Sequence, residues 1–419
     1  MDLEPGARPP PVRGLPRMVK AEMDETGAFL KDMLKRGWIE PSLAPYGAPF
    51  FFVPKPNGRG LRAVCDFRAV NNITKKVLPS LPLFENIVTQ LERAKNFSGL
   101  DLTSQFNQIR VEPDDVPITS FRTCQGLHNW KVTPMGMAGS VGTAMNCIQQ
   151  VLQHVISLPG EKLPENPRTK APLPDQEDFP DTGVWKQYKY YLSLGSYTCL
   201  FVDDILCFSR TEEEHVRHLR QVCATLQQHH WYLNFEKIEV CQPEITYLSK
   251  RVGRVGIRPT ADRAQAMMGW PEPKNTTEFK SFLGLLGFLR RYIADMAQIA
   301  APLDKFKLLK KETPWYWDKE QQLAFDKLKR RCALTPVLGI PSQDAEIVLR
   351  CDASREAMGV ALYHQDDKGF LQPIEFKSKA FNEAQKRLAA HDREGLALLY
   401  ALNVFQTFCI NAQVRGANR

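Results

Sequence analysis

The chain has 419 residues, 43% of them hydrophobic, which is enough material for two or three hydrophobic cores. It contains no signal peptide and no run of about 18 apolar residues, so neither secretion nor membrane spanning is indicated, and an intracellular, cytoplasmic protein is expected. The formal net charge of +8 favours a polyanionic partner over a polycationic one.

The N-terminal segment predicts a helix followed by extended chain. Apolar residues recur near helical spacing within residues 20–37, namely Met23, Phe29, Leu30 and Leu34. Residues 41–56 are marked by prolines and predict extended chain, and residues 61–76 predict a strand with a basic end.

A lone carboxylate follows near the end of the next apparent strand. Asp101 stands between Leu100 and Leu102 and precedes a run of mixed character, Gln105-Phe106-Asn107-Gln108-Ile109. A strand-end aspartate often only caps the element that follows it. Asp101 therefore becomes a candidate ligand only if further acids join it.

The middle of the chain predicts a helix and then an interruption. Residues 141–156 have helical periodicity, whereas residues 159–180 contain six prolines. Such a stretch cannot bury a core, so an inserted surface excursion is expected at about residues 157–196.

Two adjacent acids, Asp203 and Asp204, interrupt an otherwise apolar run from Tyr197 to Phe208. Ionised carboxylates seldom leave water without a compensating cation or hydrogen-bond donors, and no Lys or Arg lies within five residues of the pair. Two other Asp-Asp pairs, at 114–115 and 366–367, lie in polar settings typical of solvated turns. The tip of a hairpin is the alternative interpretation for Asp203-Asp204, and a bound metal ion is the functional one.

Asp101, Asp203 and Asp204 together supply three carboxylates from two predicted strands. That set is the minimum for holding two divalent cations during an in-line phosphoryl or nucleotidyl displacement. Ligation by oxygen alone points to Mg²⁺ or Mn²⁺.

Residues 211–230 predict an amphipathic helix that contains His215 and His218. Thr211 and Glu214 form a capping box in front of it. The two histidines could be half of a zinc site, but no second ligand pair follows at suitable spacing. We therefore expect them to be ordinary helix residues.

Residues 250–331 hold 18 Lys and Arg against 9 Asp and Glu, a surplus of 9 that accounts for the whole net charge. Basic pairs there are interleaved with Trp315, Tyr316 and Trp317, a pattern suited to following a phosphate backbone. A soluble, Lys-rich helical surface is the alternative. Residues 279–294 predict a helix with apolar Phe282, Leu283, Leu286 and Leu289.

These blocks, in this order, resemble the reverse transcriptases of gypsy-type LTR retrotransposons over residues 6–408. Phe201-Val202-Asp203-Asp204 resembles their Tyr-x-Asp-Asp box, and Leu100-Asp101-Leu102 resembles the box of their first metal-binding acid. The other matching blocks are Gly6 to Pro10, Ser42 to Phe52, Arg62 to Asn72, Pro134 to Met137 and Phe282 to Leu285.

The resemblance implies roles for individual residues. Lys55 and Arg62 match the residues that hold the incoming triphosphate. Phe106 matches the aromatic residue that closes over the sugar 2′ position. Met135 and Gly136 match residues of the nucleotide pocket. Without the resemblance, these would be a solvated basic loop, a core Phe and a turn. Tyr247 to Lys250 match the primer-gripping hairpin, where the family usually has Gly-His and this chain has Ser-Lys.

Near the C-terminus, Asp352 and Glu394 resemble the first two acids of an RNase H domain. The third carboxylate would follow Phe408, but residues 412–419 contain no Asp or Glu. A truncated RNase H-like domain without efficient RNA cleavage is therefore expected. The plain alternative is a strand-end Asp and a helix-surface Glu.

The resemblance implies an α+β fold: a right-hand polymerase with a connection and a partial RNase H-like α/β domain. The expected domains are an N-terminal extension and fingers at 1–76, a palm at 77–248, a thumb and connection at 249–342, and the RNase H-like domain at 343–419.

The implied activity is RNA-directed DNA polymerisation with two Mg²⁺ ions, an RNA template, a DNA or RNA primer and deoxynucleoside triphosphates, in the cytoplasm or a virus-like particle. The alternative is a decayed or domesticated retroelement protein that binds nucleic acid without polymerising. The insertion and the missing tail acids favour this alternative, and the three acids with Lys55 and Arg62 argue against it.

Overall fold

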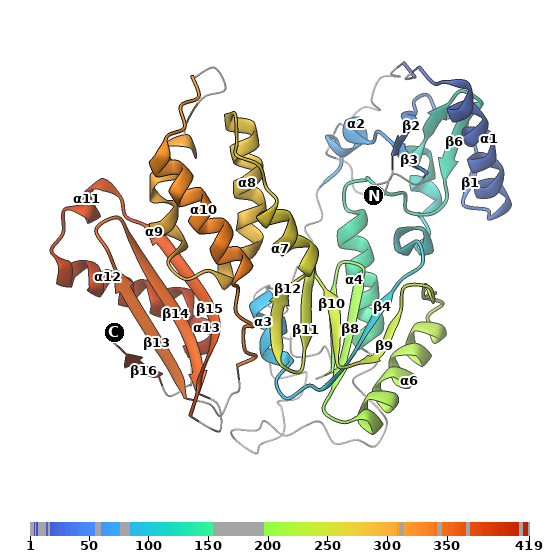
Figure 1. Ribbon diagram of the computed structural model, residues 1–419. Helices are drawn as coiled ribbons and strands as arrows, with labels where there is room; N and C mark the ends of the chain where they lie inside the picture. Colours follow the sequence, from blue (N-terminus) through green and yellow to red (C-terminus); the bar gives the residue numbers. More distant parts are fainter. Residues whose placement is uncertain are drawn as a thin grey trace. The chain divides into compact units, whose positions relative to one another are not determined.

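The computed structural model describes residues 4, 6, 14–15, 17–54, 60–75, 84–153, 197–307, 309, 314–341, 346–365, 369–409 and, as backbone, 414–417 (Figure 1). Helices and sheets are mixed throughout, as the predicted α+β class requires. The predicted insertion at 157–196, Lys55 and most of the Gly6 to Pro10 block lie outside the described residues.

The chain divides into two compact units, each assembled from separate stretches of sequence. The first contains residues 1–81, 100–205 and 217–238, and the second contains residues 82–99, 206–216 and 239–419. The chain passes from one unit to the other within two strands, β4 (Asn96–Asp101) and β8 (Asp204–Ser209).

The first unit opens with a mixed sheet and helix α1. Its elements are α1 (Lys20–Lys35), β1 (Ile39–Pro41), β2 (Ala48–Pro54), β3 (Leu61–Cys65), α2 (Arg68–Asn71), β5 (Phe121–Thr123) and β6 (Gly126–Trp130). The strand order is β1-β6-β5-β2-β3. The core of this region is aromatic, with Phe50 and Phe121 fully buried.

The predicted helix over 20–37 is confirmed as α1, where the Glu22 carboxylate accepts a hydrogen bond from the Val19 amide at 2.9 Å. The predicted strand over 61–76 is wrong beyond Cys65. Asp66 accepts hydrogen bonds from the backbone and the guanidinium of Arg68, and this local contact favours the helical turn α2 over continued strand.

The rest of the first unit surrounds a second hydrophobic core. Its further elements are η1 (Gln105–Gln108), η2 (Pro113–Thr119), α4 (Ser140–Gln153), β7 (Thr198–Phe201) and most of α6 (Glu212–Gln228). Leu100, Ile148, Leu200, Val222 and Leu226 are all buried in this core. The predicted helices over 141–156 and 211–230 are confirmed as α4 and α6, and the Glu214 amide donates to Thr211 Oγ1 at 3.2 Å in the predicted capping box.

A four-stranded sheet has the order β7-β8-β4-β9, with β9 at Glu239–Gln242. Strand β4 therefore lies between β8 and β9, although many residues separate the three along the chain. Phe97 pairs with Gln242 in the antiparallel β4-β9 ladder. The Lys95 amide, just before β4, donates to the Ser209 carbonyl at the end of β8 at 2.9 Å, so the two neighbouring strands run in opposite directions and the end of β4 lies near the start of β8.

The second unit continues with a small sheet and a helical region. Its elements are α3 (Phe84–Gln90), β10 (Glu244–Tyr247), β11 (Lys250–Gly253), β12 (Gly256–Pro259), α7 (Ala261–Met268), α8 (Thr276–Leu289), η5 (Arg290–Tyr292), α9 (Met296–Ala300), η6 (Ala301–Lys307) and α10 (Lys319–Ala333). The predicted helix over 279–294 is confirmed as α8, which begins three residues earlier and ends at Leu289. Asn275 caps it by accepting from the Glu278 amide at 2.9 Å.

The C-terminal part of the second unit is a sheet covered by a helix. Its elements are β13 (Ile347–Ala353), β14 (Ala357–Gln365), β15 (Leu371–Ala380), α11 (Glu383–Lys386), α12 (Ala390–Val404), α13 (Gln406–Cys409) and β16 (Val414–Ala417). The order is β15-β14-β13-β16, with β16 parallel to β13. Ala397 and Ala401 of α12 pack on Leu349 and Leu362 in one core.

Candidate active site

Asp203 and Asp204 lie where β7 turns into β8. Strand β7 ends at Phe201, Val202 and Asp203 form the turn, and Asp204 is the first residue of β8. Leu200 and Ile205 on either side are fully buried, whereas Asp203 is exposed and Asp204 is half-buried. The two acids therefore lie at the tip of a hairpin, which is the alternative interpretation of the sequence, and also beside buried apolar residues.

Asp101 is the last residue of β4, and the segment after α6 holds it there. Its backbone carbonyl accepts from the Asn234 amide at 2.8 Å, and the Thr103 amide donates to the Tyr232 carbonyl at 3.0 Å. Gln108 adds two further bonds to the backbone of Tyr232. The end of β4 is therefore fixed by residues more than 120 positions later in the chain.

The three carboxylates influence one another. Burial, followed by the charges of Asp203 and Asp101, raises the pKa of the Asp204 carboxyl to about 6, and the Lys237 ammonium opposes this rise. Like charges act in this way only when they are close. The role of Asp101 as a ligand beside the Asp203-Asp204 pair stays a prediction.

Lys237 is a site residue that the sequence analysis missed. Its Nζ lies 3.3 Å from Asp101 Oδ2, and the Asp101 side chain is 24% exposed. Only a weak signal was available, because Lys237 is one basic residue in a polar stretch after α6. The sequence does not show that residues 231–238 lie alongside the end of β4, so the position of Lys237 follows only from the fold.

A cation site would fit the chemistry of these donors but not their present spacing. Three carboxylates in a partly desolvated setting with one lysine leave negative charge that divalent cations neutralise well. Among the described residues, however, no group of three or more His, Cys, Asp and Glu side chains is close enough together to hold a metal. In this structure the Asp101 carboxylate is paired with the Lys237 ammonium.

Residues predicted to form the nucleotide pocket lie in the first unit. Phe106 is half-buried on η1, and Met135 is 56% exposed. Gly136 has a φ of +90°, a backbone conformation that side chains rarely adopt. The side chain of Asn71 anchors this turn. Its Nδ2 donates to the Gly136 carbonyl at 3.0 Å, and its Oδ1 accepts from the Ala138 backbone amide at 2.6 Å.

The structure describes Arg62 but not Lys55. Arg62 is exposed on β3, where it pairs with Val53 of β2. Lys55 follows the end of β2 but lies outside the described residues. The predicted triphosphate contacts of both residues remain predictions.

The predicted primer-gripping hairpin is the turn between β10 and β11. Tyr247 and Lys250 are paired across it, and Leu248 and Ser249 have φ angles of +48° and +60°. Two left-handed residues in succession make the tight turn that joins antiparallel strands. Ser249 thus occupies a left-handed position that favours glycine.

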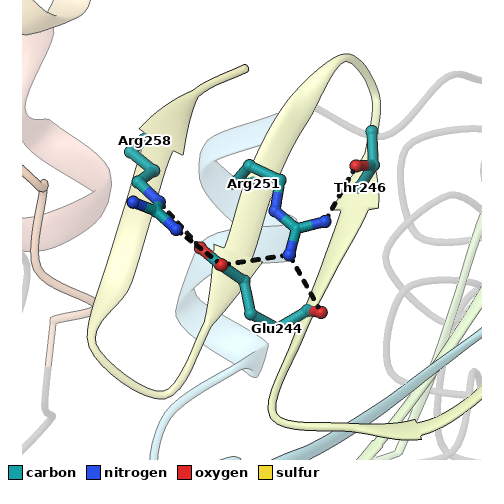
Figure 2. Close-up of polar contacts among 4 residues, drawn as sticks. All are labelled: Glu244, Thr246, Arg251 and Arg258. Carbon is teal, nitrogen blue, oxygen red and sulfur yellow. Dashed lines mark hydrogen bonds and ion pairs between the residues drawn. The ribbon is translucent and has the colours of Figure 1, made fainter. Parts of the chain in front are cut away.

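One face of the β10-β11-β12 sheet carries a charged cluster (Figure 2). Glu244 accepts from Arg258 Nη2 at 2.7 Å and from Arg251 Nη2 at 3.0 Å, and Arg251 also donates to Thr246 Oγ1 at 3.2 Å. Hydrogen bonding from Arg258 holds the pKa of the Glu244 carboxyl below its usual range. Two arginines and one glutamate leave one positive charge on this face.

The residues behind the nucleic-acid prediction for 250–331 have different surroundings. Trp315 and Trp317 stack on each other at 5.7 Å and pack against the core of the helical region, next to Phe306. Arg291 is also buried, with Nη2 3.8 Å from Glu375 Oε2. These side chains serve packing, because the surrounding helices have apolar faces to cover, while Tyr316 is exposed.

His215 and His218 are ordinary helix residues, as expected. His215 is fully buried, with Nε2 2.7 Å from Ser98 Oγ and Nδ1 2.9 Å from Ser209 Oγ. His218 stacks on Tyr197 with ring centroids 3.7 Å apart. The imidazole of His215 thus links α6 to β4 and β8.

Asp352 and Glu394 are both exposed, on β13 and α12. Cys351 and Ala353 pack into the core shared with α12. Because side chains alternate along a strand, Asp352 points to the opposite face of the sheet. The RNase H-like roles of Asp352 and Glu394 stay predictions.

The chain matches two protein-family models. Residues 53–252 match "Reverse transcriptase (RNA-dependent DNA polymerase)", and residues 317–415 match "RNase H-like domain found in reverse transcriptase". The Tf2-3 and Tf2-7 transposon polyproteins of Schizosaccharomyces pombe (strain 972 / ATCC 24843) are each 28% identical over 392 residues, which is 94% of this chain. The chain spans 26% of the length of these curated relatives.

Solved structures share the fold. A foamy viral protease-reverse transcriptase in complex with dsDNA is 20% identical with a TM-score of 0.81, and the match covers 100% of this chain and 78% of that chain. The same kind of protein in complex with an RNA/DNA hybrid is 19% identical with a TM-score of 0.75, covering 99% and 50%. This likeness confirms the predicted right-hand polymerase fold with an RNase H-like α/β domain.

Every helix within the described ranges is too short or too polar to cross a membrane.

Proposed function

Since the chain belongs to the reverse transcriptase family, we propose that it copies an RNA template into DNA by adding deoxynucleotides to a DNA or RNA primer. The observation that carries this proposal is the placement of Asp101 at the end of β4 and of Asp203 and Asp204 at the turn into the neighbouring strand β8, within the residues that match the reverse transcriptase model. Few structural roles require a half-buried acid that is close to two further acids.

Asp101, Asp203 and Asp204 would hold two divalent cations, Mg²⁺ or Mn²⁺, which when bound supply charge neutralisation for attacking and leaving oxygens. The primer 3′-hydroxyl attacks the α-phosphate of the incoming nucleotide, and pyrophosphate leaves. The protein's own part is positioning: β4 and β8 fix the acids, and Lys237 limits their repulsion while no cation is bound.

Substrate binding is assigned to the surfaces around these acids. Phe106 would close over the sugar, and the turn at Met135 and Gly136 would support the base pair, with Asn71 anchoring that turn. Arg62, together with Lys55, would hold the triphosphate. Solved relatives in complex with dsDNA and with an RNA/DNA hybrid support a nucleic-acid partner for this chain as well.

The domain division follows from the same proposal. Residues 1–76 would act as an N-terminal extension and fingers, 77–248 as the palm, 249–342 as thumb and connection, and 343–419 as an RNase H-like domain. In this proposal the RNase H-like domain assists nucleic-acid binding without efficient RNA cleavage.

The competing function is binding of nucleic acid without polymerisation. A primer-extension assay on an RNA template separates the two, with Asp203→Asn as the inactive variant. We expect extension by the parent chain and a loss on the order of a thousandfold or more in the variant. Template binding should be nearly unchanged, because it depends on basic surfaces.

Asp114→Asn is the matched control, since Asp114 is the first residue of another Asp-Asp pair and is exposed on η2. It should extend like the parent. If Asp203→Asn extends as fast as Asp114→Asn, the pair at 203–204 is not the catalytic one. If the parent itself binds primer-template but adds no nucleotide, the binding-only function is correct.

A further inference from the structure

Gln105 lies beside the candidate acids without being one of their ligands. It is the first residue of η1, only 4% exposed, and follows Ser104, which has a φ of +45°. Its Nε2 donates to the Val202 carbonyl at 2.9 Å, across 97 residues of sequence. A buried glutamine thus contacts the backbone immediately before Asp203.

Val202 has a backbone conformation that valine rarely adopts. Its φ is +58°, in the left-handed region, where the branched Cβ collides with the chain and glycine is the usual residue. Such residues persist only where surrounding contacts hold them. The hydrogen bond from Gln105 is a contact of this kind, because it holds the peptide on the C-terminal side of Val202 in place.

The orientation of the peptide between Val202 and Asp203 determines where the side chains of Asp203 and Asp204 point. The Val202 carbonyl and the Asp203 amide belong to one planar unit, so fixing the carbonyl oxygen also fixes where the chain enters Asp203. A rotation of this peptide would move the Asp203 carboxylate and change the start of β8 at Asp204.

A purely structural role explains Gln105 poorly. Its Oε1 is buried and accepts no hydrogen bond from any described residue, and a buried unsatisfied acceptor is destabilising. An apolar side chain of similar size would fill the same space without that cost. The amide is therefore better explained by what its Nε2 holds than by its contribution to packing.

We propose that Gln105 is a positioning residue for polymerisation, which holds the strained Val202 peptide so that Asp203 and Asp204 stay directed toward their cations. This inference rests on the proposed function of those two acids. It predicts a specific link: the need for Gln105 comes from the strain at Val202, and it should disappear when that strain is removed.

The test is a double-mutant cycle with Gln105→Met, Val202→Gly and the double variant. Methionine keeps the length of the side chain and removes the donor, and glycine accepts the positive φ without strain. For each variant, kcat, KM for primer-template and the Mg²⁺ concentration at half-maximal rate are measured in primer extension. Thermal midpoints report any loss of folding.

Gln105→Met should lower kcat by about 10- to 100-fold, the effect expected of misplaced catalytic groups. It should raise the required Mg²⁺ concentration and leave KM for primer-template almost unchanged. In the Val202→Gly background, the same substitution should lower kcat by no more than about threefold, because coupled residues are not additive.

Gln149→Met is the matched control, since Gln149 is a buried glutamine of α4 whose Oε1 also lacks a partner among the described residues. It should leave the Mg²⁺ requirement unchanged. Equal losses from Gln105→Met in both backgrounds, or an unchanged kcat, would overturn the proposal. Asp203→Asn is assayed alongside: if that variant stays active, the proposed function has failed, and if it is inactive while Gln105→Met is normal, only the role of Gln105 has failed.

Discussion

Two groups of carboxylates in this chain have the same chemistry and different surroundings. Asp203 and Asp204 lie next to fully buried apolar residues, and burial together with neighbouring acids raises the pKa of the Asp204 carboxyl to about 6. Asp352 and Glu394 resemble a second catalytic pair, yet both are exposed, and Asp352 lies on the sheet face opposite to α12. A strand-end acid becomes a candidate ligand through its burial and its neighbours, and the motif alone does not distinguish the two cases.

The largest expected effect separates the two groups in one molecule. With a labelled RNA in an RNA/DNA hybrid and Mg²⁺ or Mn²⁺, we expect extension of the DNA primer but RNA cleavage slower by about a thousandfold or more than a complete site would give, because charge on the scissile phosphate goes unneutralised. Asp352→Asn should change neither activity.

Steady RNA degradation that disappears in Asp352→Asn would contradict this comparison and require another acid to complete the site. Glu375 is poorly suited to that task, because it is buried between Arg291 and Lys377, at 3.8 Å and 3.9 Å. Asp392 on α12 would then be the next residue to substitute.

The surroundings of the first group should also select the substrate. Phe106→Val should open space beside the sugar 2′ position and improve ribonucleotide use relative to deoxynucleotides by about 10- to 100-fold, the range that steric discrimination reaches. The ratio of kcat/KM values for the two nucleotides measures this. Phe106→Tyr keeps the ring and should keep the discrimination, and an unchanged ratio in Phe106→Val would remove the gating role.

A smaller effect is expected at the charged face of the β10-β11-β12 sheet. Arg258→Gln should weaken primer-template binding several-fold and reduce the slope of log affinity against log salt by about 1, as the loss of one phosphate contact does. Arg36→Gln is the control, since the two arginine side chains are similarly exposed, 50% and 53%, and each is paired with an acid. Equal salt slopes for both variants would mean that this face does not contact nucleic acid.

The smallest effect concerns stability. The folded pKa of Asp204, about 6, is higher than its ordinary value of 3.8, so the folded state binds the proton more tightly and stability falls as pH rises from about 4 to 6. Asp204→Asn should therefore stabilise the cation-free protein at pH 8 by about 1 kcal/mol after allowance for solvent screening. The gain should vanish near pH 4.

Asp352→Asn provides the contrast in the same chemical denaturation experiment. Asp352 is exposed, so its substitution should change the free energy of unfolding by less than about 0.5 kcal/mol at either pH. A destabilised Asp204→Asn at pH 8 without Mg²⁺ would show that the first group is not under the repulsion described.

Local patterns predicted the helices and the acids well. Helices α1, α4, α6 and α8 follow from apolar spacing and caps, because these signals lie within a few turns of one another. The Asp203-Asp204 pair was evident because the apolar run around it needed an explanation. The end of β3 was missed, since a single Asp66-Arg68 contact outweighed the β-rich sequence that follows.

Contacts between distant segments could not be read from the sequence. Lys237 and Asp101 are 136 residues apart, and Gln105 and Val202 are 97 apart. Trp315 and Trp317 looked like nucleic-acid contacts because basic pairs occur in the same stretch of sequence, but in the fold they are partly buried and pack against the core of the helical region. Roles that depend on such contacts require the fold.

The central place of β4 in its sheet also affects how the chain can fold. Its partner β9 comes much later, and the Cys241 amide donates to Ser98 Oγ at 2.8 Å across 143 residues. Loop closure over such a distance is slow. During synthesis, the edge of β4 that pairs with β9 therefore stays unpaired until β9 has left the ribosome. Unpaired strand edges invite association with other chains. We therefore expect this segment to be aggregation-prone in the nascent polypeptide and to benefit from chaperone protection.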